Sequence, residues 1–114
     1  MNEKLQDWKK VVDFFKKKFT DGEEPEMDTI LFLIGVQELG RVKPSFTKDE
    51  KVNLMHIATC KLLEPYGYYK FDKFDEDAWP HYKRVKLLPK MKAKEQEDLM
   101  KEAIISYFKE NQLI

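Results

Sequence analysis

The stretch TILFLIGVQEL, residues 29–39, is apolar on nearly every side when it is wound as a helix. Such a helix usually lies in the middle of a bundle or in an oligomer interface, because no side of it suits water. Asp28 precedes the stretch as a candidate N-cap, and Gly40 follows it as a residue suited to a left-handed C-cap. Gly35 inside the helix costs about 1 kcal/mol of helix propensity relative to alanine. We expect that cost to be offset by the close approach of a neighbouring helix or ring.

Three further segments have the pattern of amphipathic helices. Apolar residues recur three and four positions apart over about 2–19, 48–63 and 93–111. The sequence TKDE, which begins at Thr47, predicts a capping box at the start of the second of these segments. All five prolines fall between helical segments, as expected from their poor fit to a helix interior. The sequence therefore predicts a mainly α-helical fold, a single four-helix domain over residues 1–114.

Residues 64–90, before the last predicted helix, combine turn-forming residues with many aromatic rings. The rings belong to Tyr66, Tyr68, Tyr69, Phe71, Phe74, Trp79 and Tyr82. Aromatic and polar residues alternate on both sides of an acidic turn, so the segment is either irregular or a short hairpin. Pro80 argues against a long hairpin.

Three roles are open for the rings of residues 64–90. They close the helical core, form a recognition surface or stack nucleobases. The interleaved acids oppose a polyanion, which favours core closure first and recognition second. Trp79 is predicted to be largely buried and to anchor the segment, with its indole N–H bonded to a carbonyl or carboxylate, because tryptophan gains much from burial.

Candidate chemistry in the sequence is incomplete wherever it occurs. Asp75 and Asp77 have the alternating spacing of the first ligands of a calcium loop, and His81 is close by, but the glycine and glutamate of such a loop are missing. His56 and Cys60 are neighbours on a helix, as in a cysteine–histidine catalytic pair. No oxyanion-stabilising group can be identified beside them. We therefore assign no metal ligand and no catalytic residue.

Polar groups near apolar segments are the remaining candidates for binding. Glu38 lies in the last turn of the apolar helix, where burial would raise its pKa and make it an acid or base. Emergence of that turn into water is favoured, because glutamate is rarely fully buried. The residues that we assign to ligand or partner binding are Tyr68, Tyr69, Trp79, His81, Tyr82, Glu38 and His56.

The composition limits the class of partner. Lys and Arg number 21, as do Asp and Glu, which argues against the broad basic face of a nucleic-acid-binding protein. The apolar runs are too short to span a bilayer, and the N-terminal residues lack the apolar stretch of a signal peptide. The single cysteine fits a reducing compartment. We expect a soluble cytoplasmic protein with no cofactor, no membrane association and no nucleic-acid partner.

The phrases LFLIGVQELG, EKVNLMHIAT, LLEPYGYY and DEDAWPHY resemble a family of short bacterial proteins, chiefly of the Bacteroidetes, with no assigned function. The resemblance spans most of the chain and rests on whole phrases rather than on a diagnostic motif. It implies a cytoplasmic bacterial protein. It carries over no catalytic residue, cofactor or fold.

Two functions from different classes remain open. Apolar residues off the main helix faces, Phe14, Ile57 and Ile105, favour a non-enzymatic interaction module that forms a homodimer. The alternative is a small ligand-binding protein or enzyme with a pocket between the helices and residues 64–90. Its polar group would be Glu38, His56 or His81, which would have to converge in that pocket. No substrate, partner or pathway can be read from the sequence.

Overall fold

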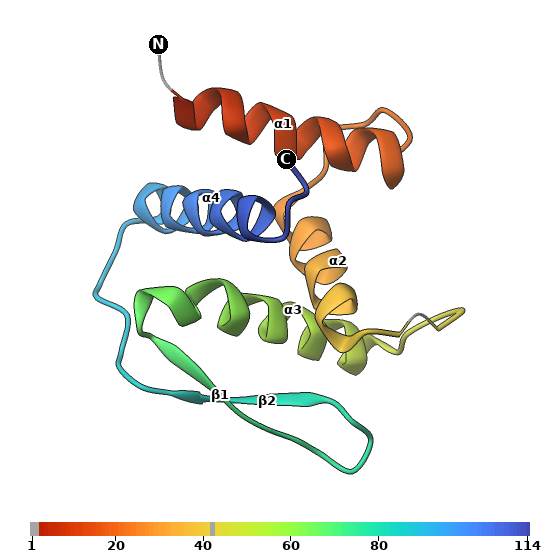
Figure 1. Cartoon of the computed structure of the whole chain (residues 1–114), viewed down its shortest axis with the longest axis vertical. Helices are drawn as coiled ribbons and strands as arrows, with labels where there is room; N and C mark the ends of the chain where they lie inside the picture. The colour runs from red at the N-terminus through yellow and green to blue at the C-terminus, as the bar shows by residue number, and fades with distance from the viewer. Residues whose placement is uncertain (1–2, 42) are drawn as a thin grey trace. The chain divides into compact units, whose positions relative to one another are not determined.

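The structure is a computed structural model that describes residues 3–41 and 43–114 (Figure 1). The elements of this described part are α1 (Glu3–Lys18), α2 (Met27–Leu39), α3 (Lys48–Leu63), the 3-10 turn η1 (Glu64–Tyr66), β1 (Tyr69–Phe74), β2 (Pro80–Arg84) and α4 (Ala93–Glu110). The predicted mainly α-helical fold with four helices is confirmed. Of the two alternatives for residues 64–90, the structure forms the short antiparallel hairpin. No helix in the described ranges is long and apolar enough to cross a membrane.

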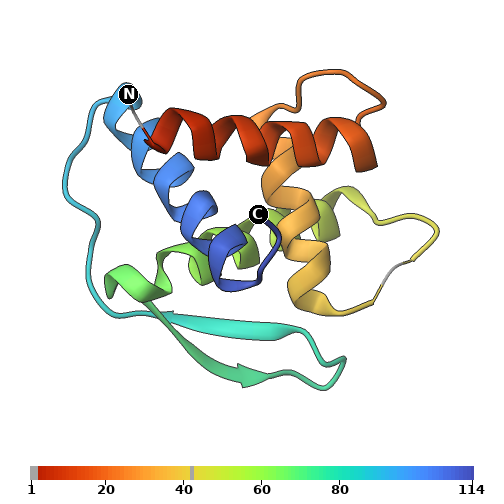
Figure 2. The ribbon, with the colours of Figure 1, turned by 45° about the horizontal axis from the view of Figure 1, so that its top comes forward.

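The chain divides into two compact units. The two-helix unit contains α1 and α4. The hairpin unit, Glu26–Leu88, contains α2, α3, η1 and both strands. In the hairpin unit the strands run antiparallel beside α3 (Figure 2). The predicted organisation of residues 1–114 as one domain stays a prediction.

The two-helix unit has an aromatic core. Phe15 of α1 and Phe108 of α4 are buried, with ring centroids 5.5 Å apart. The ring of Phe14 meets that of Phe108 edge-on at 5.1 Å. Edge-to-face pairs of this kind add to the gain from burial. On the surface, the Lys109 ammonium pairs with the Asp7 carboxylate at 2.8 Å and joins the same two helices.

Gly35 allows α2 and α3 to pack backbone against backbone. A Cβ built on Gly35 would lie 2.1 Å from the carbonyl oxygen of Leu54 and 2.6 Å from its carbonyl carbon. No side chain fits at that distance, so glycine is required by the approach of α3. The predicted compensation for a glycine inside α2 is therefore confirmed. Beside this contact lies the hairpin-unit core, made of Leu39, Leu54 and Ile57.

Local end signals define α2 and α3. The Glu50 backbone N–H donates to the Thr47 hydroxyl at 3.1 Å, and the Thr47 N–H donates to the Glu50 carboxylate at 2.9 Å. The predicted capping box is thus confirmed, and it satisfies two helix-terminal donors. Gly40 ends α2 in the left-handed conformation with φ of 80°, as predicted, and its N–H donates to the Val36 carbonyl.

The predicted N-cap of α2 was wrong. The helix begins at Met27, so Glu26 is the N-cap and Asp28 lies in the first turn. Glu26 makes no side-chain cap bond. Asp28 still favours the helix, because a carboxylate in the first turn interacts well with the positive end of the helix dipole. The predicted start of the first helix at residue 2 lies outside the described residues.

A β-bulge decides which side chains share a face of the hairpin. Phe71 pairs with Tyr82 and Phe74 pairs with Pro80, so β1 has one residue more than β2 between these pairs. The extra residue reverses the usual alternation, as bulges do. Phe71 and Phe74 therefore lie on one face, with ring centroids 5.0 Å apart.

Candidate functional site

The seven predicted binding residues all lie in the hairpin unit. Glu38 is near Tyr82, and the His56 ring lies edge-on to Tyr69 with centroids 6.3 Å apart. His81 and Trp79 belong to the end of the hairpin, where His81 pairs with Asp75. Tyr68 is engaged by the ammonium of Lys86, 4.7 Å from its ring centroid. Of the groups expected to converge in a pocket, Glu38 and His56 both lie toward Tyr82, His56 through its contact with Cys60, whereas His81 is paired in the turn.

Tyr82 joins the hairpin to the helices. It is partly buried against the hairpin-unit core, and its ring meets that of Phe71 edge-on at 5.8 Å. Burial raises the pKa of the Tyr82 phenol to about 12, with smaller contributions from the carboxylates of Glu38 and Glu64. The phenol is therefore protonated at neutral pH and cannot act as a base there. Its role in the hairpin is packing.

Cys60 is unsuited to nucleophilic chemistry. Its thiol is fully buried, and its sulfur lies 3.5 Å from Nε2 of His56. Burial, followed by the negative charge of Glu64, raises the Cys60 pKa to about 11. The reactive species of a cysteine is the thiolate, which is scarce at neutral pH under these conditions. Burial and the raised pKa thus both disfavour a thiolate beside His56.

We expect Cys60 to react with iodoacetamide roughly 100-fold more slowly at pH 8 than an unperturbed thiol does, because its thiolate fraction is that much smaller. The rate should keep rising as the pH approaches 11, since the raised pKa of about 11 delays ionisation. Mass spectrometry of timed samples gives the rate, and a sample unfolded in urea supplies the control. A rate that levels off near pH 8.5 in the folded protein would contradict this assignment.

Asp75 organises the turn of the hairpin. Its Oδ1 accepts the backbone N–H groups of Asp77 at 2.9 Å and Trp79 at 3.0 Å, and its Oδ2 pairs with Nε2 of His81 at 2.9 Å. The bond to His81, then the bond from Trp79, holds the Asp75 pKa below its ordinary value. Arg41 donates to the carbonyl of Asp77 from the loop after α2. These contacts use Asp75 and His81 to shape the turn. The described residues contain no group of three or more His, Cys, Asp or Glu placed to hold a metal.

Trp79 packs against the hairpin-unit core, and most of its surface is covered, as predicted. The predicted bond of the indole N–H stays a prediction. Anchoring of the hairpin is shared between Trp79 and Tyr82, both of which contact the same core.

The expected exposure of Phe14, Ile57 and Ile105 was wrong for two of the three residues. Ile57 is 2% exposed and Ile105 is 8% exposed, so neither offers an apolar surface. Ile57 is covered because α3 contacts α2 and the hairpin, which together bury more than one side of the helix. Phe14 is partly buried, with its ring against Phe108.

An exposed aromatic surface occurs instead on the hairpin. We call it the aromatic edge, formed by Phe71 and Phe74 with Tyr82 at its base. Phe71 is 38% exposed and Phe74 is 61% exposed. Sequence reasoning included both rings in the aromatic segment but did not select them. The bulge in β1, which places them together, has no clear signature in the sequence YKFDKF.

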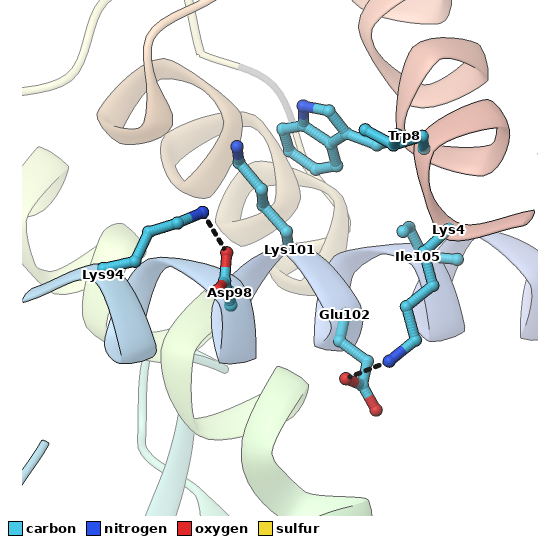
Figure 3. A pocket seen from close by; sticks show the side chains of 8 residues that line it. Lys4, Trp8, Lys94, Asp98, Lys101, Glu102 and Ile105 are labelled. Carbon is cyan, nitrogen blue, oxygen red and sulfur yellow. Dashed lines mark hydrogen bonds and ion pairs between the residues drawn. The ribbon is translucent and has the colours of Figure 1, made fainter. Parts of the chain in front are cut away.

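A groove between α1 and α4 of the two-helix unit was also missed (Figure 3). It has a volume of about 370 Å³. Its lining residues are Lys4, Leu5, Trp8, Lys94, Asp98, Lys101, Glu102 and Ile105. The predicted binding residues are absent from this lining. The only signal for it in the sequence is the spacing of Lys94, Asp98 and Lys101, which places three charged residues along one side of a helix.

No family model, no curated protein and no solved structure matches the chain. The resemblance to short bacterial proteins therefore stays a prediction. Any function has to be argued from the residues themselves.

Proposed function

We propose that this chain is a non-enzymatic interaction module that forms a homodimer through the aromatic edge. The observation that carries the proposal is the exposure of Phe71 and Phe74, two adjacent rings on a short hairpin. Exposed apolar patches on small proteins commonly mark association sites. Aromatic residues are also the side chains enriched at interfaces. The predicted binding residue Tyr82 supports this edge from below.

The rigidity of the aromatic edge supports the proposal. The ring of Phe71 rests against the partly buried ring of Tyr82 at 5.8 Å. The Phe71 backbone N–H, at the outer edge of β1, donates to the Glu64 carboxylate at 2.8 Å. Side chains held in place before binding lose less conformational entropy on association. A second copy would meet an ordered surface.

Charge distribution supports the aromatic edge over the opposite face of the hairpin. On that opposite face, Lys70 stands opposite Lys83 in the strand register, and Lys73 stands opposite His81. All four of these side chains are exposed. Lys83 and His81 are paired with Asp72 and Asp75, but two copies meeting through this face would bring Lys70 and Lys73 close to like charges, which is unfavourable. A symmetric dimer uses the same patch on both copies, so the apolar face suits it better.

The surroundings of Cys60 and His81 support a non-enzymatic role. Cys60 is buried with a raised pKa, and His81 is paired with Asp75 in the turn. An acid–base or nucleophilic site requires such groups to converge on one reacting atom.

The proposed location is the cytoplasm, which is supported by the single cysteine remaining as a buried thiol.

The homodimer is tested by sedimentation velocity over a range of protein concentrations. We expect the parent to sediment as a dimer at high micromolar concentration. Phe74→Ser should raise the dissociation constant about 1,000-fold, because an interface ring at a hot spot contributes about 2 kcal/mol and both copies lose it. Phe19→Ser removes a ring that is 54% exposed just after α1 and serves as the matched control.

The control variant should dimerise like the parent, and circular dichroism should show helices in both variants. A parent that remains monomeric at high micromolar concentration rules out the homodimer. If Phe74→Ser and Phe19→Ser weaken dimerisation equally, the interface does not lie at the aromatic edge.

A further inference from the structure

The groove between α1 and α4 combines the size and chemistry of a small-molecule site (Figure 3). Its volume of about 370 Å³ falls within the range of roughly 300–1,000 Å³ found for ligand pockets. Its walls come from both helices of the two-helix unit. Leu5 and Trp8 lie one turn apart on α1, and Ile105 lies on α4.

The apolar part of the groove can hold a hydrocarbon or aromatic group. Trp8 is partly buried, and Ile105 is 8% exposed. Leu5 is 69% exposed, which is unusual for a leucine on the apolar side of its helix. A ligand covering Leu5 and Trp8 would remove their apolar surface from water, with a gain proportional to the covered area.

Charged side chains lie in three places along the groove. Two of these places hold an ion pair whose two members both line the groove. At one end the Lys94 ammonium binds the Asp98 carboxylate at 2.8 Å, and at the other the Lys4 ammonium binds the Glu102 carboxylate at 3.2 Å. Between them Lys101 extends from α4 toward the indole of Trp8, with its ammonium 5.3 Å from the ring centroid (Figure 3).

Each lysine of the groove has a carboxylate partner, but the partner of Lys101 stands outside the lining. Three lysines and two carboxylates line the groove. Lys101 pairs at 3.1 Å with Glu97, which does not line the groove. An ammonium has three donors, so Lys101 can keep Glu97 and bind a second carboxylate. The ammonium of Lys101 thus stands against the aromatic wall with donors in addition to the one that binds Glu97.

We propose that this groove binds a small amphipathic carboxylate. The carboxylate accepts from Lys101, and the apolar body lies against Trp8, Leu5 and Ile105. An amine of the same shape would place its charge next to Lys101 and would be rejected. An uncharged alcohol would lose the charge-assisted bond, which is stronger than a neutral one. The proposal is independent of the homodimer, because the aromatic edge belongs to the other unit.

The binding is tested by fluorescence and calorimetry. The chain has two tryptophans, so a Trp79→Phe variant leaves Trp8 as the only indole reporter. Octanoate and 4-phenylbutyrate probe alkyl and aryl bodies, and octylamine is the matched probe of opposite charge. We expect a saturable change in Trp8 fluorescence with at least one carboxylate and none with octylamine. Isothermal titration of the unmodified chain checks that the Trp79→Phe background does not create the response.

Lys101→Gln should weaken carboxylate binding about tenfold, because a charge-assisted bond is lost. Lys9→Gln, at an exposed position of α1 outside the groove, is the matched control and should bind like the parent. Absence of binding by both carboxylates overturns the proposal. Equal responses to octanoate and octylamine, or equal affinities of the two lysine variants, overturn it as well.

Discussion

Gly35→Ala will destabilise the hairpin unit by about 3 kcal/mol, the upper part of the range for overpacked cores. The added Cβ would lie 2.1 Å from the carbonyl oxygen of Leu54, which belongs to the backbone of α3 and cannot rotate away. The helices must therefore separate, and the hairpin-unit core beside them loses contacts. Alanine is the better helix former by about 1 kcal/mol, so helix propensity alone predicts the opposite sign.

Urea denaturation followed by circular dichroism measures this effect on the free energy of unfolding. Gly40→Ala is the matched control, because an added Cβ there meets nothing within 4 Å. Its cost arises from the left-handed conformation alone and should be about 1–2 kcal/mol. A Gly35→Ala variant as stable as the parent would falsify the backbone contact between α2 and α3.

Phe108→Ala will destabilise the two-helix unit by about 3–5 kcal/mol, the range for truncating large buried aromatic residues. Phe108 is 1% exposed, and its ring lies 5.1 Å from Phe14 and 5.5 Å from Phe15. Removing it leaves a cavity between α1 and α4 in addition to the lost burial. Little else in the described core of this unit can fill a space of that shape.

The measurement uses the two tryptophans, one in each unit. Trp8 fluorescence reports the unit that contains Phe108, whereas Trp79 reports the hairpin unit. Single-tryptophan variants should show the Trp8 transition moving to lower urea concentration in Phe108→Ala. Phe19→Ala removes a ring that is 54% exposed and should cost about 1 kcal/mol or less. A Phe108 variant that resembles the Phe19 variant would show that this ring is not part of the core.

The helices could be predicted because their signals are local. Thr47 with Glu50 forms its cap within one turn, and Gly40 adopts the left-handed conformation predicted for it. The prediction of helix ends failed at one residue, Asp28. Glu26 and Asp28 both carry acceptors near the start of α2, and local chemistry alone did not identify which residue precedes the helix.

The surfaces could not be predicted, because exposure depends on residues far apart in the sequence. Ile57 lies off the main apolar face of its helix, yet it is part of the hairpin-unit core. Phe71 and Phe74 differ in strand parity, so simple alternation places them on opposite faces. Only the bulge between the paired strands brings them to the same face.

The sequence by itself determined the four helices, the capping box of α3 and the left-handed C-cap at Gly40, because each depends on periodicity or on backbone chemistry within a few residues. The need for glycine at position 35 came from the tertiary structure, since the atom that excludes a Cβ there is the Leu54 carbonyl oxygen of α3. The tertiary structure decided the hairpin, the aromatic edge and the groove around Trp8 and Lys101. The two sides of that groove come from α1 and α4, at opposite ends of the sequence. The sequence pattern of each helix does not identify the helix that packs against it, because an apolar stripe specifies that a face is buried but not which residues cover that face.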